Sequence, residues 1–440
     1  MSHDTLRVAV ATLGCKVNQF ESAAFITGFC EQGCKIVAPS DKADIFVINT
    51  CAVTARAGQQ SRQLIRKTAR ANPEARLVIT GCYAQLAAAE LPDLAQHSQM
   101  TVIGNASKQH LVEAALSERP PALLATQIAT ARTISSLAVR RFGSRTRAYL
   151  RIQDGCNNFC AYCIVPYTRG RSRSLPLPEV LKQVQVFAEE GYLELVVTGI
   201  NASKYGLDLD EGTDIYTLLD ILCREFPQIR IRLSSIEPTE VNDRLLDLLA
   251  KHQNFMPHFH IPLQSGDNEI LARMNRRYTA ASFAQAVEQI HALAPHAAIG
   301  CDVLAGFPGE DEAAAANTRK LLQSLPVSYL HVFPYSIRPG TSAAHLPDQV
   351  PGPVKDKRVI SLHKLDREKR TAFYQQQLGM EQRVLIERKD KKTGLLKGFS
   401  ENYIPVLCDG PSSLIRTVVP VRLDEARQDV VLGEQQMSRQ

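Results

Sequence analysis

The chain has 440 residues, of which 45% are hydrophobic and 22% charged, so we expect a soluble globular protein of two to four domains. Its net charge of +6 is too small to identify a partner. Eleven cysteines, an odd number, favour metal or catalytic use in a reducing compartment and argue against a disulfide framework. The sequence shows no secretory signal and no apolar run of about eighteen residues, so we expect a cytoplasmic protein without a membrane span.

The first part of the chain alternates short apolar runs with helical patterns. The strands expected from this pattern are residues 7–12, 45–49, 77–80 and 100–103, and the expected helices are residues 22–31, 57–71 and 85–95. Alternating strands and helices predict a parallel sheet with helices on its faces. We therefore expect a Rossmann-like α/β domain at residues 5–116.

Three cysteines of this domain, Cys15, Cys51 and Cys82, each follow one of the expected strands. Loops at the carboxyl ends of parallel strands converge on one crevice, so the three thiols are expected to lie together. Gly14 and Gly81 precede two of them and let the backbone approach a bulky ligand. Three thiolates can hold a cubane iron–sulfur cluster whose fourth iron has no protein ligand. The alternative is three buried structural thiols, because free cysteine is often buried.

A second three-cysteine motif is denser. Cys156, Cys160 and Cys163 have the spacing C-x3-C-x2-C. A small molecule with an amine and a carboxylate can chelate the open iron of a cluster held by three such thiolates. A structural zinc site instead has four Cys or His ligands, usually arranged in pairs, and the sequence has no second C-x2-C. We therefore interpret this motif as an iron–sulfur site.

Basic and small residues flank this motif. Residues 117–141, with two adjacent prolines, are expected to be a linker. Arg169 and Arg171 follow the motif in a run of arginines, and such a run contacts phosphates in nucleic-acid-binding proteins. Two alternatives remain open: a solvated loop, or arginines that hold acidic groups of the protein itself.

Residues 142–374 again alternate strands and helices. Besides the strand before Cys156, we expect strands at residues 193–198, 230–234, 258–261, 298–305 and 329–332. Helices are expected at residues 179–190, 215–225, 243–251, 282–293, 312–325 and 354–379. Six β/α units predict a partial TIM-like (β/α)6 barrel with its active site at the C-terminal ends of the strands.

The last part of the chain, residues 375–440, shows short strands expected at residues 382–387, 398–408 and 416–422. Short strands punctuated by turn residues suggest a small OB-like β-barrel, a fold that often binds oligonucleotides. Phe399 and Tyr403 lie near several lysines in the sequence and would give RNA a stacking surface. The alternative is that both rings belong to the barrel core.

These motifs together resemble the radical S-adenosylmethionine (SAM) methylthiotransferases, over almost the whole chain. The family signature is C-x3-C-x2-C with an aromatic residue, here Tyr162, before the last cysteine; residues 5–115 resemble its N-terminal domain, and residues 398–406 its C-terminal TRAM domain. The resemblance implies two [4Fe–4S] clusters, one held by each cysteine set. It also implies SAM-binding residues, namely Tyr162, Thr198, Gly199, Asn201, Ser235, Glu237 and Gln264. The residues assigned to substrate are Arg169, Arg171, Phe399 and Tyr403.

The resemblance implies that a methylthio group is attached to an unactivated carbon with two molecules of SAM. One would methylate sulfur held at the first cluster, and the other would be cleaved at the second to a radical that removes hydrogen from the target. An aromatic C–H offers no acidic proton, which explains why no convincing Ser/His/Asp arrangement occurs. The implied partners are tRNA, a low-potential electron donor such as flavodoxin or ferredoxin, and a sulfur donor. We expect a monomer.

The substrate branch is suggested by residues 14–19 and 49–54. They most resemble the branch that converts N6-threonylcarbamoyladenosine at position 37 of tRNA to its 2-methylthio derivative. Alternatives are the branches acting on isopentenyl-adenosine in tRNA or on an aspartate of a ribosomal protein. A rival from another class is a non-catalytic iron–sulfur protein that binds RNA.

Overall fold

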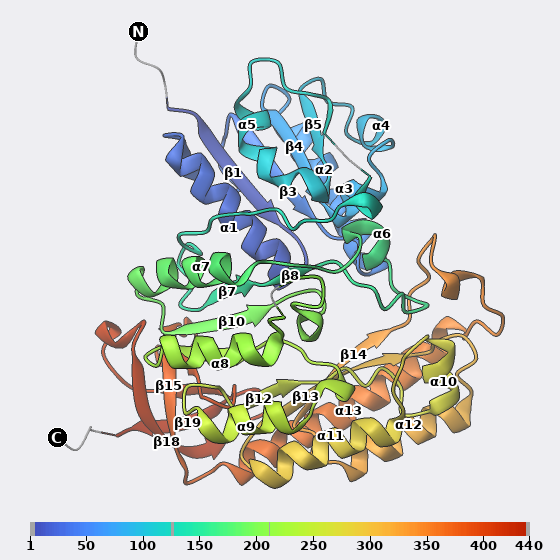
Figure 1. Ribbon diagram of the computed structural model, residues 1–440, viewed down its shortest axis with the longest axis vertical. Coiled ribbons are helices and arrows are strands. Elements are labelled where there is room, and N and C mark those ends of the chain that lie inside the picture. The colour runs from blue at the N-terminus through green and yellow to red at the C-terminus, as the bar shows by residue number, and fades with distance from the viewer. Residues whose placement is uncertain (1–4, 125–126, 211, 437–440) are drawn as a thin grey trace.

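The structure is a computed structural model that describes residues 5–124, 127–210 and 212–436. Its N-terminal part (blue to cyan) lies above a central part (green to orange), and the C-terminal part (red) lies beside the lower end of the central part (Figure 1). Among the described residues, no helix is long and apolar enough to cross a membrane.

The N-terminal part is a six-stranded parallel sheet in the order β2-β1-β3-β4-β5-β6. Its strands are β1 (Arg7–Thr12), β2 (Lys35–Val37), β3 (Ile45–Thr50), β4 (Arg76–Gly81), β5 (Met100–Ile103) and β6 (Leu123–Leu124). Its helices are α1 (Lys16–Glu31), α2 (Ala55–Ala71), α3 (Cys82–Leu86), α4 (Leu91–Ala95) and α5 (Leu111–Leu116). The expected parallel α/β fold is confirmed; the short edge strands β2 and β6 were not predicted, and the helix expected at residues 85–95 is two short helices.

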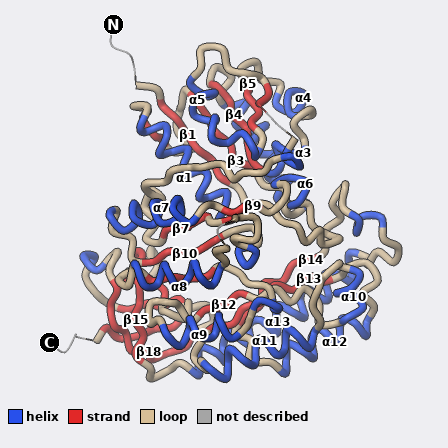
Figure 2. Tube along the Cα trace, in the orientation of Figure 1, coloured by secondary structure: helices blue, strands red, loops and turns tan. Residues whose placement is uncertain are grey.

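The central part contains the six predicted parallel strands. They are β7 (Ala148–Arg151), β10 (Glu194–Thr198), β11 (Arg230–Leu233), β12 (His258–His260), β13 (Ala298–Ala305) and β14 (Tyr329–Pro334). They form two three-stranded sheets, β7-β10-β11 and β12-β13-β14, and a single bridge between Ile231 and Phe255 links the two. Figure 2 shows the two sheets in a curved arrangement, as in a partial barrel.

The helices of the central part cover the outside of this barrel. The long ones are α7 (Leu177–Glu189), α8 (Ile215–Glu225), α9 (Asp243–Lys251), α11 (Ala280–Leu293), α12 (Glu312–Ser324) and α13 (Gly352–Gln376). The short pair β8 (Gln153–Asp154) and β9 (Arg173–Ser174) flanks the C-x3-C-x2-C loop and the short helix α6 (Val165–Arg169). Another short helix, α10 (Asn268–Arg273), was not predicted.

The C-terminal part is a closed five-stranded barrel, as expected for an OB-like domain. Its strands are β15 (Glu381–Lys389), β16 (Leu396–Phe399), β17 (Pro405–Cys408), β18 (Val418–Ala426) and β19 (Val431–Gln435). The single strand expected at residues 398–408 is two strands, because the chain turns between them with Tyr403 at a φ of 67°. The strand β19 was not predicted.

One face of α1 in the N-terminal part belongs to the hydrophobic core of the central part, while the N-terminal sheet also has core clusters of its own. Helix α1 of the first sheet packs its Phe20 against Phe142 of the central part, with ring centroids 6.3 Å apart. Ala23 and Ala24 of the same helix belong to the core that contains Leu150 of β7. This shared core brings the loop after β1, where α1 begins, to the open side of the barrel.

Candidate functional site

The three cysteines of the N-terminal part converge as their positions after parallel strands predict. Cys51 and Cys82 are buried, whereas Cys15 is exposed by surface area. Cys82 contributes to the raised pKa of both Cys15 and Cys51, and Cys15 contributes to that of Cys51. Burial is the first cause of both shifts and, with these neighbours, raises the pKa of Cys51 to about 11. Neighbouring thiols of this kind favour a bound cation that stabilises their deprotonated form.

Two glycines allow this close approach. Gly14 has a φ of 99°, and a Cβ there would lie 2.8 Å from the Cβ and Sγ of Cys51. Gly81 has a φ of 96°, and its Cβ would lie 2.3 Å from the carbonyl oxygen of Thr50. Only glycine fits both the left-handed backbone and the space, so the loops before Cys15 and Cys82 pack directly against the loop of Cys51.

The second set lies in the loop between β8 and α6. The pKa of Cys163 is raised to about 12, first by burial and then by the neighbouring Cys160 and Cys156. The backbone N–H of Asn158 donates to Cys156 Sγ at 3.4 Å, and the Asn201 amide lies 3.9 Å from the same sulfur. Three thiols on one loop, with N–H donors aimed at sulfur, fit a cubane iron–sulfur cluster.

Arg276, which follows α10, fixes the second set from outside its own loop. Its guanidinium donates to Cys160 Sγ at 3.3 Å and pairs with Glu237 at 3.0 Å. Asn158 donates to the other carboxylate oxygen of Glu237 at 3.3 Å. Burial raises the pKa of Glu237, and Arg276 lowers it in part. Sequence patterns do not reveal this role of Arg276, because Cys160 lies 116 residues away in the chain.

A buried ionic network joins the two cysteine sets. Arg169 pairs with Glu21 of α1 at 3.0 Å and with Asp154 at 2.9 Å, and it donates to the Asn18 side chain at 2.6 Å. Asn18 donates to the carbonyl of Thr50, beside Cys51, at 3.0 Å. Asp154 accepts from the N–H of Gly155, beside Cys156, at 2.8 Å. Lys108 adds a further contact to Glu21.

The position of Arg169 decides between the alternatives left open for it. Its side chain is 1% exposed and enclosed by acidic groups of the protein, so it does not offer its guanidinium to phosphate on the surface. Arg171, two residues later, is exposed and lies 4.7 Å from the centre of the Phe159 ring. Of the two arginines, Arg171 alone is placed where a nucleic acid can reach it.

A cavity of about 710 Å³ runs through the open side of the barrel. It is lined by Cys15 and by three of the predicted cofactor residues, Thr198, Gly199 and Ser235. Phe399 and Tyr403 of the C-terminal barrel line it as well. The cavity therefore connects the first cysteine set, the strand ends of the barrel and the C-terminal part.

Of the remaining predicted cofactor residues, Asn201 and Glu237 reach the second set as described. Tyr162, within the C-x3-C-x2-C loop, is partly buried and its ring packs against Phe307 at 6.3 Å. Gln264, with a φ of 64°, continues the β12 edge toward β13, where its N–H donates to the carbonyl of Asp302 at 2.8 Å. Gln264 and Tyr162 do not line the 710 Å³ cavity.

Phe399 and Tyr403 stack on one another at 4.7 Å and face the central barrel. Arg147 lies 5.0 Å and Arg232 4.8 Å from the centre of the Tyr403 ring, and the His258 ring lies 4.6 Å from it. Both rings are only half-buried, so they are neither the barrel core nor an outward surface. They form the inner wall of the cavity at the contact between the two barrels.

Comparison with known proteins identifies the family. Residues 7–104 match the family described as uncharacterized protein family UPF0004, and residues 150–322 match the radical SAM superfamily. The threonylcarbamoyladenosine tRNA methylthiotransferase MtaB of Aquifex aeolicus is 38% identical over 408 residues, which are 92% of this chain and 97% of that protein. The chain belongs to the radical SAM methylthiotransferases. The MtaB of Bacillus subtilis is 37% identical, over 95% of this chain and 94% of that protein.

Other members of the family carry a different name. The tRNA-2-methylthio-N(6)-dimethylallyladenosine synthase of Pelotomaculum thermopropionicum is 33% identical, over 95% of each chain. Among solved structures, the radical SAM methyltransferase TsrM of Kitasatospora setae matches this methylthiotransferase with a TM-score of 0.58 at 14% identity, over 77% of this chain and 75% of that one. At that identity the likeness shows a shared fold. As a family member, the chain is a transferase.

Proposed function

We propose that this methylthiotransferase acts on N6-threonylcarbamoyladenosine at position 37 of tRNA, with one [4Fe–4S] cluster on each cysteine set and two molecules of SAM. The observation that carries the proposal is the shared cavity, in which Cys15, Thr198 and Ser235 line one wall. Sulfur held beside Cys15 and SAM bound at the strand ends would both reach a base inserted there. The names of the A. aeolicus and B. subtilis relatives support the same substrate.

The chain's own residues would bind, orient and shield. The clusters, when bound, supply the one-electron cleavage of SAM and the site of sulfur transfer, chemistry that side chains alone do not provide. Arg276 holds Cys160 and Glu237 in place, and the network around Arg169 fixes both cysteine loops against each other. Phe399 and Tyr403 line the same cavity, where they would exclude water and offer a stacking surface.

The proposal extends to partners and domain limits. A low-potential electron donor such as flavodoxin or ferredoxin and a sulfur donor are required by the reaction. We place the domain limits at residues 5–116, 117–141, 142–374 and 375–440. Arg171 is proposed as a phosphate contact because it is exposed beside the second cysteine set.

Iron analysis tests the clusters. In anaerobically reconstituted protein we expect about eight irons per chain, and about four in the variant with Cys156, Cys160 and Cys163 all changed to Ala. About four irons falling to none would mean that Cys15, Cys51 and Cys82 hold no cluster and would contradict the two-cluster mechanism.

Nucleoside mass spectrometry tests the substrate. The reduced protein is given SAM, sulfide and tRNA that carries either threonylcarbamoyladenosine or isopentenyl-adenosine at position 37, and we expect the 2-methylthio product from the first tRNA. The isopentenyl branch is the second candidate because the P. thermopropionicum relative carries that name. A product from the isopentenyl tRNA alone would establish it instead.

A further inference from the structure

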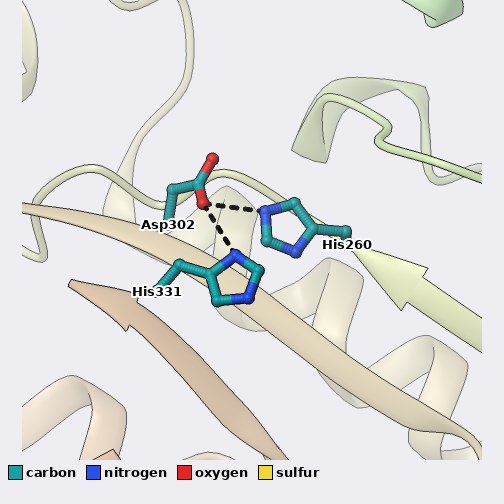
Figure 3. A group of neighbouring side chains, drawn as sticks. All are labelled: His260, Asp302 and His331. Carbon is teal, nitrogen blue, oxygen red and sulfur yellow. Dashed lines mark ion pairs between the residues drawn. The ribbon is translucent and has the colours of Figure 1, made fainter. Parts of the chain in front are cut away.

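Three polar side chains point into the barrel from adjacent strands: His260 of β12, Asp302 of β13 and His331 of β14. His260 Nε2 lies 2.9 Å and His331 Nδ1 3.5 Å from the same carboxylate oxygen of Asp302 (Figure 3). All three line the 710 Å³ cavity. We call them the lumen triad. Removal of hydrogen by a radical does not need them, so their place in the cavity calls for another role.

The lumen triad contains an ionised carboxylate. Burial raises the pKa of Asp302, but hydrogen bonds from His260 and His331 outweigh burial and hold the pKa well below its usual range. The carboxylate therefore stays ionised at neutral pH and accepts hydrogen bonds. The Tyr329 hydroxyl lies 3.5 Å from His260 Nδ1, the other ring nitrogen, and helps to orient the imidazole.

A cation faces the same cavity from the N-terminal part. Lys16, beside Cys15, lines the cavity and is half-buried. Within the described part of the chain its ammonium makes no ion pair. Arg147 and Arg232 act on it electrostatically, and Asp302 opposes them from beyond ion-pair distance. The two arginines on the cavity wall are both paired: Arg232 with Glu194 at 2.8 Å, and Arg370 with Asp366 at 2.9 Å.

These charges define the ligand that the cavity suits. An ammonium held out of water without a counter-ion is unfavourable, so an anionic group on a ligand gains most by lying beside Lys16. Asp302 favours hydrogen-bond donors on the same ligand. Aromatic rings of Tyr149, Tyr329 and Tyr403 on the wall suit a base. The volume lies within the range of about 300–1,000 Å³ that small-molecule sites show.

We propose that Lys16 and the lumen triad recognise the N6 substituent of the target adenosine. They select a substituent that carries a carboxylate and hydroxyl or N–H donors over an apolar substituent. The carboxylate pairs with Lys16, the donors bind Asp302, and both histidines hold Asp302 in place. An apolar substituent would leave Lys16 without an ionic partner and would offer Asp302 no donor beyond its two histidines, which is unfavourable. The inference rests on the proposed function, because it requires a modified adenosine in this cavity.

Binding of anticodon stem-loop RNAs to the reconstituted protein tests this recognition. Three RNAs differ only at the target adenosine: the threonylcarbamoyl form, its methyl ester, which lacks the negative charge, and the isopentenyl form. We expect the acid to bind about tenfold or more tightly than the ester, as loss of a charge-assisted contact predicts. Lys16→Met should remove the difference between acid and ester, and Lys16→Arg should keep part of it. His331→Leu should weaken the binding of the acid form several-fold.

The control is Lys67→Met, which removes the same charge from an exposed site on α2, away from the cavity. It should leave the ratio of acid to ester unchanged. Iron content is measured in every variant. Loss of iron from the Lys16→Met protein would mean that Lys16 serves the cysteine set instead of the substrate and would overturn the inference.

Two further outcomes separate this inference from the proposed function. A wild-type protein that modifies the threonylcarbamoyl RNA yet binds acid and ester equally overturns the inference alone. A protein that modifies neither adenosine overturns the proposed function as well. Two histidines and a carboxylate are also ligands that suit a transition metal. A stoichiometric metal other than iron that disappears in the His331→Leu protein would make the lumen triad a metal site and overturn substrate recognition by it.

Discussion

Each cysteine set brings three thiols together, but the two sets do so on backbones of different kinds. Cys15, Cys51 and Cys82 follow three strands and are 36 and 31 residues apart in the chain, so they meet only when the sheet is formed. Cys156, Cys160 and Cys163 share one loop, whose position depends on groups outside it, such as Arg276. The first site is a product of global folding, and the second is a local motif held in place by its neighbours.

A change at Arg169 should affect both sets, because its network joins them. Arg169→Met leaves Glu21 and Asp154 buried without their main partner. We expect a loss of about 3–5 kcal/mol in the free energy of unfolding, as for other broken buried pairs. Denaturant titration measures it. Arg171→Met, an exposed neighbour, is the matched control, and equal effects of the two changes would contradict the role of the network.

The same network predicts how stability depends on pH. Burial raises the pKa of Glu21, but Arg169 and Lys108 outweigh burial and hold it well below its usual range. A lowered folded-state pKa adds stability that is complete above the unfolded value of about 4.3 and is lost as the pH falls toward the folded value. Glu21→Gln should therefore be less stable than wild type at pH 7 and show a shallower loss below about pH 4. Parallel curves for the two proteins would refute this.

Gly81 offers a change confined to the first set. Gly81→Ala adds a Cβ that would lie 2.3 Å from the Thr50 carbonyl oxygen, at a φ that favours glycine. We expect a loss of about 2–3 kcal/mol in stability and about half of the bound iron. Gly33→Ala, also at positive φ but with open space around its Cβ, should cost about 1 kcal/mol and keep all iron. Full iron in the Gly81→Ala protein would argue against a cluster there.

Arg276 offers the corresponding change at the second set. Arg276→Gln removes the donor to Cys160 Sγ and the partner of Glu237. We expect some loss of stability, because Glu237 keeps only the Asn158 amide as a close partner. We also expect iron at this set to be lost to a chelator about 10–100 times more readily, as for other groups that support metal ligands. Iron release is followed by absorbance in a protein in which Cys15, Cys51 and Cys82 are all changed to Ala, so that only the second set can hold iron. An unchanged rate would show that the loop holds the cysteines unaided.

The smallest effect is expected where neither set is touched. Arg171→Ala removes one exposed positive charge beside the second set. Binding of tRNA should weaken a few-fold, and the slope of affinity against salt concentration should fall by about one charge. The salt dependence distinguishes loss of a phosphate contact from an indirect effect, because a change in protein conformation alone would leave the slope of affinity against salt concentration unchanged.

Sequence patterns predicted most of the framework because the strands are short, apolar and regularly spaced. Strand β13 and the position of each cysteine after its strand followed directly from the sequence. The split of residues 398–408 into two strands did not, because Tyr403 takes a φ of 67° where the sequence has no glycine to mark a turn.

The burial of Arg169 was equally hard to foresee. A run of arginines is the same in sequence whether it faces phosphate or carboxylate, and Glu21, its partner, is 148 residues away. The grouping of the lumen triad with Lys16 was not predicted for a related reason: it depends on neighbouring strands and on another domain, although Lys16 lies within the residues that suggested the substrate branch. Charges paired across domains cannot be assigned from local patterns.

Because of the ionic network around Arg169, the first domain depends on residues of the next domain for its stability. Asn18, Glu21 and Lys108 belong to the first domain, whereas Arg169 and Asp154 belong to the next. A fragment that ends at residue 116 would keep its sheet and three cysteines, yet it would expose Phe20 and leave Glu21 without Arg169. Transplanting this domain onto another barrel would therefore require Arg169 and Asp154 to move with it, although they lie on the far side of the linker. The two domains are separate in sequence, but each is stabilised in part by ion pairs with residues of the other.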